Sequence, residues 1–82
     1  MQIQNGDKVW KVEVQENHVV IYRQHSQGGE NYWESELMKP VDEESIHEIF
    51  EYLSEHVEHK PFRLTLTEDI WEYAKNCRDE DI

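Results

Sequence analysis

Hydrophobic and polar residues follow two different periods along the chain. Over residues 42–59 the apolar residues recur at spacings of three and four, which is typical of an amphipathic helix with one face on a core. These residues are Ile46, Ile49, Phe50, Leu53 and Val57. Over much of residues 8–38 the pattern instead alternates with a period of two, as it does in strands. The pattern therefore predicts a sheet followed by a helix.

Three main strands are expected, over residues 8–15, 18–24 and 32–38. The polar connections between them are short, and the second contains Gly28-Gly29. Consecutive strands joined in this way pair as an antiparallel meander. A further short strand over residues 2–4, turning at Asn5-Gly6, would extend the same sheet.

Three residues mark the ends of the predicted helix. Pro40 ends the third strand, and Asp42 is expected to be the N-cap residue of the helix. Pro61 disfavours helix in the residue before it, so the helix should end near His59.

The segment after Pro61 alternates again. Phe62, Leu64 and Leu66 are separated by polar residues, which predicts a short fourth strand over residues 62–66. Thr67 is then expected to cap a second helix over residues 68–78.

These elements give the order β-β-β-α-β-α. The expected fold is a single small α+β domain over residues 1–82, with an antiparallel meander of three to four strands and two helices. A chain of 82 residues has no room for a second core.

The second main strand carries bulky residues on both of its faces. Val19 and Ile21 share one face, and Val20 and Tyr22 share the other. A sheet with one wetted face alternates more cleanly, so we expect the second helix to cover the back face. The alternative is that Tyr22, Tyr32 and their apolar neighbours meet a partner.

Net charge adds more to this picture than any motif. The chain has 8 Lys and Arg residues against 19 Asp and Glu residues, which gives a net charge of −11. This field disfavours direct binding to nucleic acid or an anionic membrane, since phosphate contacts need Lys and Arg. It favours a basic partner, including a protein cleft that normally holds nucleic acid. Solubility alone and a salt-adapted surface are the alternatives.

The strongest local feature is a row of glutamates opposite the apolar face of the predicted helix, which we call the acidic ridge. It consists of Glu44, Glu48, Glu51, Glu55 and Glu58. The row would extend about 21 Å, with neighbouring carboxylates roughly 6 Å apart, close to the charge spacing of a nucleic-acid strand. No Lys or Arg lies between Lys39 and Lys60, whereas an ordinary solvated helix face, the alternative interpretation, mixes both signs of charge.

Other candidate chemistry is weak. His56 and His59 are three residues apart but lack a Cys-x-x-Cys or His-Glu-x-x-His pattern, so no metal site is predicted. Cys77 is followed by acidic residues, which disfavour a reactive thiolate. Gly28-Gly29 lacks the context of a phosphate-binding loop. We therefore predict no cofactor and no enzymatic activity.

The sequence favours a small acidic protein-binding module. Its specific form would be an inhibitor that docks the acidic ridge on a basic, nucleic-acid-binding surface of a partner, as nucleic-acid-mimicking anti-defence proteins and immunity proteins of similar charge and size do. The predicted contacts beyond the ridge are Tyr52, as an aromatic anchor, and Glu68, Asp69 and Glu72, as outer contributors. The alternative is a structural or regulatory subunit that binds through Tyr22 and Tyr32 or through an open strand edge.

The expected location is the cytoplasm. The chain has no apolar run long enough to cross a membrane and no signal segment at its start. Its single cysteine, Cys77, cannot form an internal disulfide, which is typical of a reducing compartment.

Overall fold

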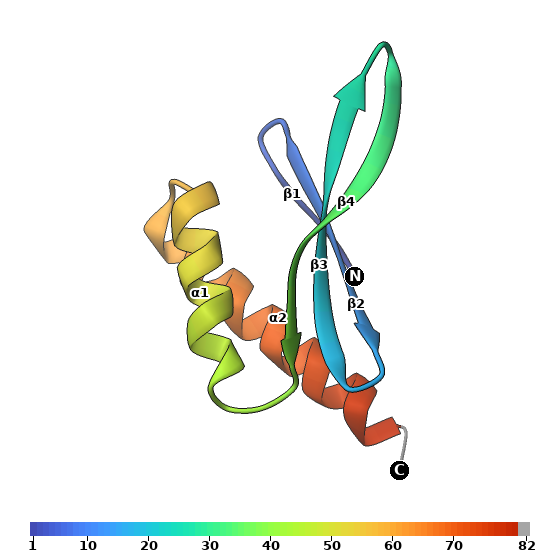
Figure 1. Cartoon of the computed structure of the whole chain (residues 1–82). Helices are drawn as coiled ribbons and strands as arrows, with labels where there is room; N and C mark the ends of the chain where they lie inside the picture. The colour runs from blue at the N-terminus through green and yellow to red at the C-terminus, as the bar shows by residue number, and fades with distance from the viewer. Residues whose placement is uncertain (81–82) are drawn as a thin grey trace.

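The structure, a computed structural model, describes the backbone of residues 1–80 and the side chains of residues 1–77. Its elements are β1 (Gln2–Asn5), β2 (Lys8–Gln15), β3 (His18–Gln27), β4 (Glu30–Pro40), α1 (Ser45–His56) and α2 (Lys60–Glu80) (Figure 1). The strands form one sheet in the order β1-β2-β3-β4, and every neighbouring pair is antiparallel. The predicted α+β class, the antiparallel meander and the short N-terminal strand are confirmed.

Tight turns join the strands. Glu16 and Asn17, between β2 and β3, both adopt left-handed conformations, with φ of 52° and 65°. Two such residues in a two-residue loop match the twist of a hairpin, and Asn tolerates this conformation well. The carbonyl oxygen of Asn17 also accepts a hydrogen bond of 2.9 Å from the amide of Val41, which ties this turn to the end of β4.

Both helices pack on the same face of the sheet, which we call the front face. Trp10 and Val12 of β2 lie on it, together with their neighbours from β3, and at most 1% of either side chain is exposed. The buried core they join also contains Ile3, Val19, Ile21, Val41, Ile49, Leu53, Val57, Leu66, Ile70 and Ala74. Val20 is equally buried but lies outside this core, on the back face. The expectation that the second helix covers the back face is therefore wrong.

The predicted fourth strand over residues 62–66 is also wrong, because these residues belong to α2. The order is β-β-β-β-α-α rather than β-β-β-α-β-α. Pro61 lies in the first turn of α2, where a proline has no helical hydrogen bond to lose. Leu66 is buried whereas Leu64 is 49% exposed, so the apolar residues here follow the helical period that continues to Ile70.

Thr67 lies inside α2 and does not cap it. Its hydroxyl Oγ1 donates a hydrogen bond of 2.7 Å to the carbonyl oxygen of Arg63, one turn earlier. A threonine hydroxyl commonly bonds in this way within a helix. The second helix begins at Lys60, eight residues before the predicted start at Glu68.

The first helix is shorter than predicted, since it begins at Ser45 rather than Asp42 and ends at His56. The N-cap residue is Glu44, so the predicted N-cap at Asp42 is wrong. Oδ1 of Asp42 nevertheless accepts hydrogen bonds of 3.1 Å from the amides of Glu44 and Ser45. This carboxylate satisfies amides that have no partner within the helix.

Two cations satisfy the carbonyl groups at the other end of α1. Nζ of Lys8 donates to the carbonyl oxygen of His56 at 2.9 Å, and Nη1 of Arg63 donates to that of Val57 at 2.7 Å. Positive charge at the C-terminus of a helix is favourable. Neither α1 nor α2, as far as the structure describes them, is long and apolar enough to cross a membrane.

Candidate functional site

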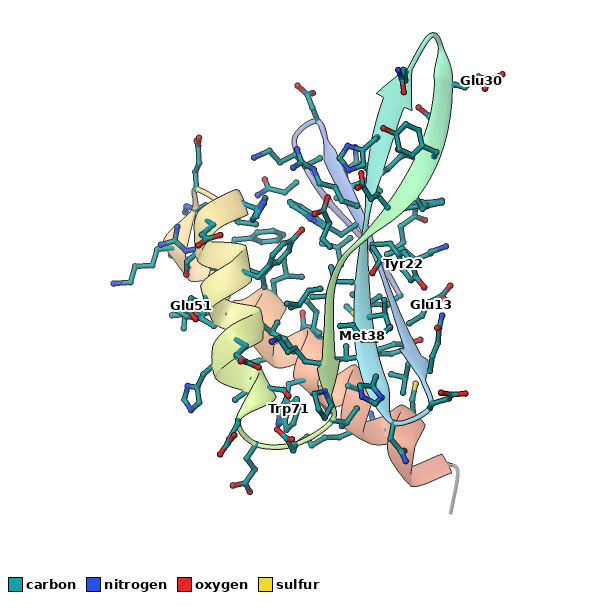
Figure 2. All side chains as sticks on the ribbon, viewed as in Figure 1. Glu13, Tyr22, Glu30, Met38, Glu51 and Trp71 are labelled. Atoms are coloured by element: carbon teal, nitrogen blue, oxygen red, sulfur yellow. The ribbon has the colours of Figure 1, made fainter. Side chains whose placement is uncertain are left out.

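The acidic ridge is exposed along its whole length, but one continuous helix does not carry it. All five glutamates are exposed, and the side chain of Glu51 points away from the sheet (Figure 2). Glu48, Glu51 and Glu55 lie on α1, whereas Glu44 precedes its first residue and Glu58 follows its last. The helical part of the row is therefore about 10 Å long at 1.5 Å per residue, which corrects the 21 Å expected for an unbroken helix.

The fold brings one cation to the ridge. Nζ of Lys39, on β4, lies 3.4 Å from Oε1 of Glu48, and both side chains are partly exposed. An exposed pair of this kind contributes at most about 1 kcal/mol. Within residues 1–77, no other ridge glutamate forms an ion pair. Most of the charge of the ridge is therefore left unpaired.

Tyr52 faces the sheet. Its hydroxyl accepts a hydrogen bond of 3.3 Å from Nε1 of Trp10, and its ring stacks on that of His56 at 4.3 Å between centroids. Burial raises the pKa of the Tyr52 hydroxyl, and the carboxylate of Glu36 raises it further, while the hydrogen bond from Trp10 and the charge of Arg23 act in the opposite direction. Tyr52 thus joins α1 to β2, and its role as a partner anchor stays a prediction.

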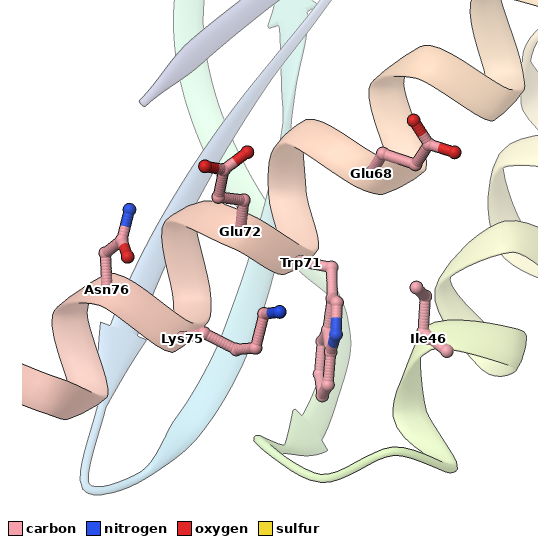
Figure 3. Close-up of a pocket in the computed structure, with 6 residues that line it drawn as sticks. All are labelled: Ile46, Glu68, Trp71, Glu72, Lys75 and Asn76. Carbon is pink, nitrogen blue, oxygen red and sulfur yellow. The ribbon is translucent and has the colours of Figure 1, made fainter.

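Glu68 and Glu72 of α2 lie beside a groove between the two helices (Figure 3). One hollow of this groove, of about 400 Å³, is lined by Ile46 of α1 and by Glu68, Trp71, Glu72, Lys75 and Asn76 of α2. An adjoining hollow is lined by Ile46, His47, Phe50, Leu64, Thr67 and Glu68. Asp69 is exposed but lines neither hollow. The groove is lined by apolar side chains of both helices, and its α2 side also carries two carboxylates and the ammonium group of Lys75.

The predicted site residues therefore form two separate acidic strips. Ile46 and Phe50 turn one flank of α1 toward α2, whereas Glu48 lies on the opposite flank beside β4. The groove consequently separates the acidic ridge from Glu68 and Glu72. A partner that contacts both strips has to span the groove.

On the back face of the sheet, side chains from neighbouring strands contact one another. Nζ of Lys11 lies 5.0 Å from the ring centroid of Tyr22 and 4.9 Å from that of Trp33. Nε2 of Gln15 donates a hydrogen bond of 3.1 Å to the Tyr22 hydroxyl. Met38, the cross-strand partner of Val20, is 56% exposed. This face is a second candidate contact surface.

Tyr32 and Tyr22 lie on opposite faces of the sheet. The interpretation of the two tyrosines as one aromatic face requires them to share a face and is therefore wrong. The register pairs Tyr22 with Ser35 and His25 with Tyr32, which places the two tyrosines on opposite faces. The cause is a β-bulge at Glu36, the extra residue of β4 opposite the Ile21/Tyr22 step. One inserted residue reverses the facing of every side chain beyond it.

Within the described residues, neither the histidine pair nor Cys77 belongs to the group of three clustered metal-ligating side chains that the structure contains. Nδ1 of His56 lies 2.9 Å from the carbonyl oxygen of Tyr52, so one of its ring nitrogens is already engaged. His59 lies with it beside a shallow hollow next to the β1–β2 turn. Cys77 is a free, half-buried thiol on α2.

Comparison with known proteins identifies no relative. No protein-family model matches the chain, and no curated protein or solved structure is significantly similar to it.

Proposed function

We propose that this chain is a small, non-catalytic protein-binding module that docks the acidic ridge on a basic surface of a partner protein. The observation that carries the proposal is that all five ridge glutamates are exposed and that, within residues 1–77, Lys39 is the one cation paired with them. Like charges one helical turn apart are destabilising by about 0.2–0.5 kcal/mol per pair. A surface that serves solubility alone mixes both signs and avoids this cost.

In its specific form, the module is an inhibitor that occupies a nucleic-acid-binding site. Carboxylates accept short, charge-assisted hydrogen bonds from Arg and Lys, the side chains that otherwise hold phosphates. Complementary charge also accelerates association. Glu68, Asp69 and Glu72 are outer contributors, Tyr52 lies at the margin of the contact, and the partner is a nucleic-acid-binding enzyme of the cytoplasm.

The test compares two variants of equal charge. The ridge variant changes Glu44, Glu48, Glu51, Glu55 and Glu58 to glutamine. The matched control changes five glutamates of the sheet and its turns, Glu13, Glu16, Glu30, Glu34 and Glu36, to glutamine. Each variant goes from a net charge of −11 to −6, because five negative charges are removed. Any difference between them therefore reports where the charge lies.

Both variants and the unchanged chain are immobilised and incubated with a cell extract. The proteins they bind are then eluted across a salt series in the presence of EDTA. We expect the unchanged chain and the control to retain a common basic partner, and the ridge variant to lose it although its circular dichroism is unchanged. Retention by the ridge variant would contradict the proposal. Equal loss by both variants would show that net charge, and not the ridge, holds the partner.

The second candidate function is a structural or regulatory subunit that binds through the back face. The exposure of Met38 and the position of both helices on the front face favour it. In that case Tyr22→Ala and Met38→Ser abolish partner retention, while the ridge variant retains the partner.

A further inference from the structure

The β-bulge in β4 gathers three metal-ligating side chains on the distal part of the β3–β4 hairpin. This hairpin extends beyond the helices (Figure 1). Glu36 is the bulged residue, and His25 and Glu34 face the same side of the sheet. A bulge turns the side chain of its extra residue out of the regular alternation. The bulge thereby brings a second carboxylate to His25. Without it, regular alternation would place Glu36 on the opposite face from Leu37 and therefore away from His25.

The donor atoms are spaced as the ligands of one small cation. Nε2 of His25 lies 3.3 Å from Oε2 of Glu34 and 3.1 Å from Oε1 of Glu36. The three donor atoms all lie within 4.8 Å of one another, and within the described part of the chain no other group of three or more His, Cys, Asp or Glu does so. Zinc–ligand bonds of about 2.1 Å in a tetrahedron place two ligands about 3.4 Å apart. The two separations from Nε2 of His25 are close to this value.

We propose that His25, Glu34 and Glu36 form a binding site for one divalent transition-metal ion of the zinc class. One imidazole and two carboxylates are a donor set that such ions accept, whereas Mg²⁺ and Ca²⁺ prefer oxygen ligands alone. Three protein ligands leave the fourth tetrahedral position to water or to a donor from a partner.

The surroundings of His25 suit this role. Its ring stacks on Tyr32 at 5.4 Å between centroids and 21° between planes, which restricts its rotation. The side chains of His25 and Glu36 are 28% and 26% exposed, so the ion remains accessible from solvent. Bound metal would join β3 to β4 between the β-bulge and the loop of the hairpin. The site does not depend on the acidic ridge.

The probe is Zn²⁺ alone, titrated by calorimetry into the full chain with millimolar Mg²⁺ present. The excess Mg²⁺ occupies scattered carboxylates of this acidic protein. We expect one saturable Zn²⁺ site and a rise in the thermal unfolding temperature, because an ion that binds the folded chain stabilises it. His25→Gln, Glu34→Gln and Glu36→Gln should each weaken binding by at least about tenfold and reduce the rise in unfolding temperature.

The matched control is His47→Gln, which removes an exposed histidine of α1 and should leave Zn²⁺ binding unchanged. Circular dichroism of each variant checks that it is folded. The absence of saturable Zn²⁺ binding to the unchanged chain would overturn the proposal and leave His25 as the ion-pair partner of the two glutamates. Binding that survives His25→Gln but is lost in His59→Gln would also overturn it, by moving the ion to the β1–β2 turn.

Discussion

The two faces of the sheet are buried in different ways. On the front face, Trp10 and Ile21 are covered by two helices and reach 1% exposure. On the back face, Val20 is as deeply buried although both helices lie on the other side. There the ammonium group of Lys11 lies over the rings of Tyr22 and Trp33. Long charged side chains can cover apolar surface in this way, so bulky residues on both faces of a strand do not require a second layer.

The largest expected difference between the faces comes from two tryptophans. Trp10→Ala removes a buried core side chain and should reduce the free energy of unfolding by about 3–5 kcal/mol, as measured by urea denaturation. Trp33→Ala, on the back face, should cost much less because its side chain is only partly buried. Equal losses from both substitutions would mean that the back face contributes as much to stability as the front face does.

The attachment of α1 to the front face should depend on Asp42. Asp42→Ala removes the acceptor of two amide hydrogen bonds and of one from the Ser45 hydroxyl. We expect a loss of about 1 kcal/mol in the free energy of unfolding. Asp42→Asn, which keeps an acceptor oxygen, is the control and should lose less. A full loss in Asp42→Asn would attribute the effect to the negative charge rather than to the hydrogen bonds.

The back face should respond weakly to the loss of its central cation. Lys11→Ala removes the ammonium group over the two rings together with the aliphatic stem that carries it, and should cost about 0.5–1 kcal/mol in urea denaturation. Lys11→Met keeps an apolar stem of similar length. If Lys11→Met is as unstable as Lys11→Ala, the charge matters more than the covering stem.

The smallest expected effect is a pH dependence at the contact between α1 and the front face. Because burial raises the pKa of the Tyr52 hydroxyl above its ordinary value of 10.0, the folded state holds this proton more tightly than the unfolded state does. The resulting stability is present below pH 10 and is lost as the pH rises through the raised pKa. Urea denaturation between pH 8 and 11 should therefore show a steeper decline for the unchanged chain than for Tyr52→Phe. Parallel declines would contradict this assignment.

The periodicity of apolar residues is sufficient to predict elements whose pattern fits a single period, such as β2 and α1. The alternation in β2 and the helical spacing around Leu53 each fit one period over many residues. Over residues 62–66 three apolar residues fit a strand, while the extension to Ile70 fits a helix, and Pro61 is compatible with either a helix end or a helix start. The helix is favoured because Leu66 and Ile70 then reach the core together.

The candidate sites depend on contacts that periodicity does not contain. Lys39 is nine residues from Glu48 and meets it because β4 runs beside α1. The group of His25, Glu34 and Glu36 requires both the hairpin register and the bulge, and its spacing matches no short metal-binding motif. A histidine before a hairpin loop and two glutamates after it were the available signal. The exposure of Glu48, Glu51 and Glu55, by contrast, follows from the helical period of α1, whereas Glu44 and Glu58 are exposed outside the helix.

The most direct test of the central claim is carboxylate labelling by carbodiimide chemistry, with and without the captured partner, read by mass spectrometry. If the acidic ridge is the docking surface, the partner should protect Glu48, Glu51 and Glu55 from labelling. Glu16, in the β2–β3 turn, and Glu30, at the start of β4, should react as in the free chain. Unchanged labelling of the three ridge glutamates in the complex would contradict the account.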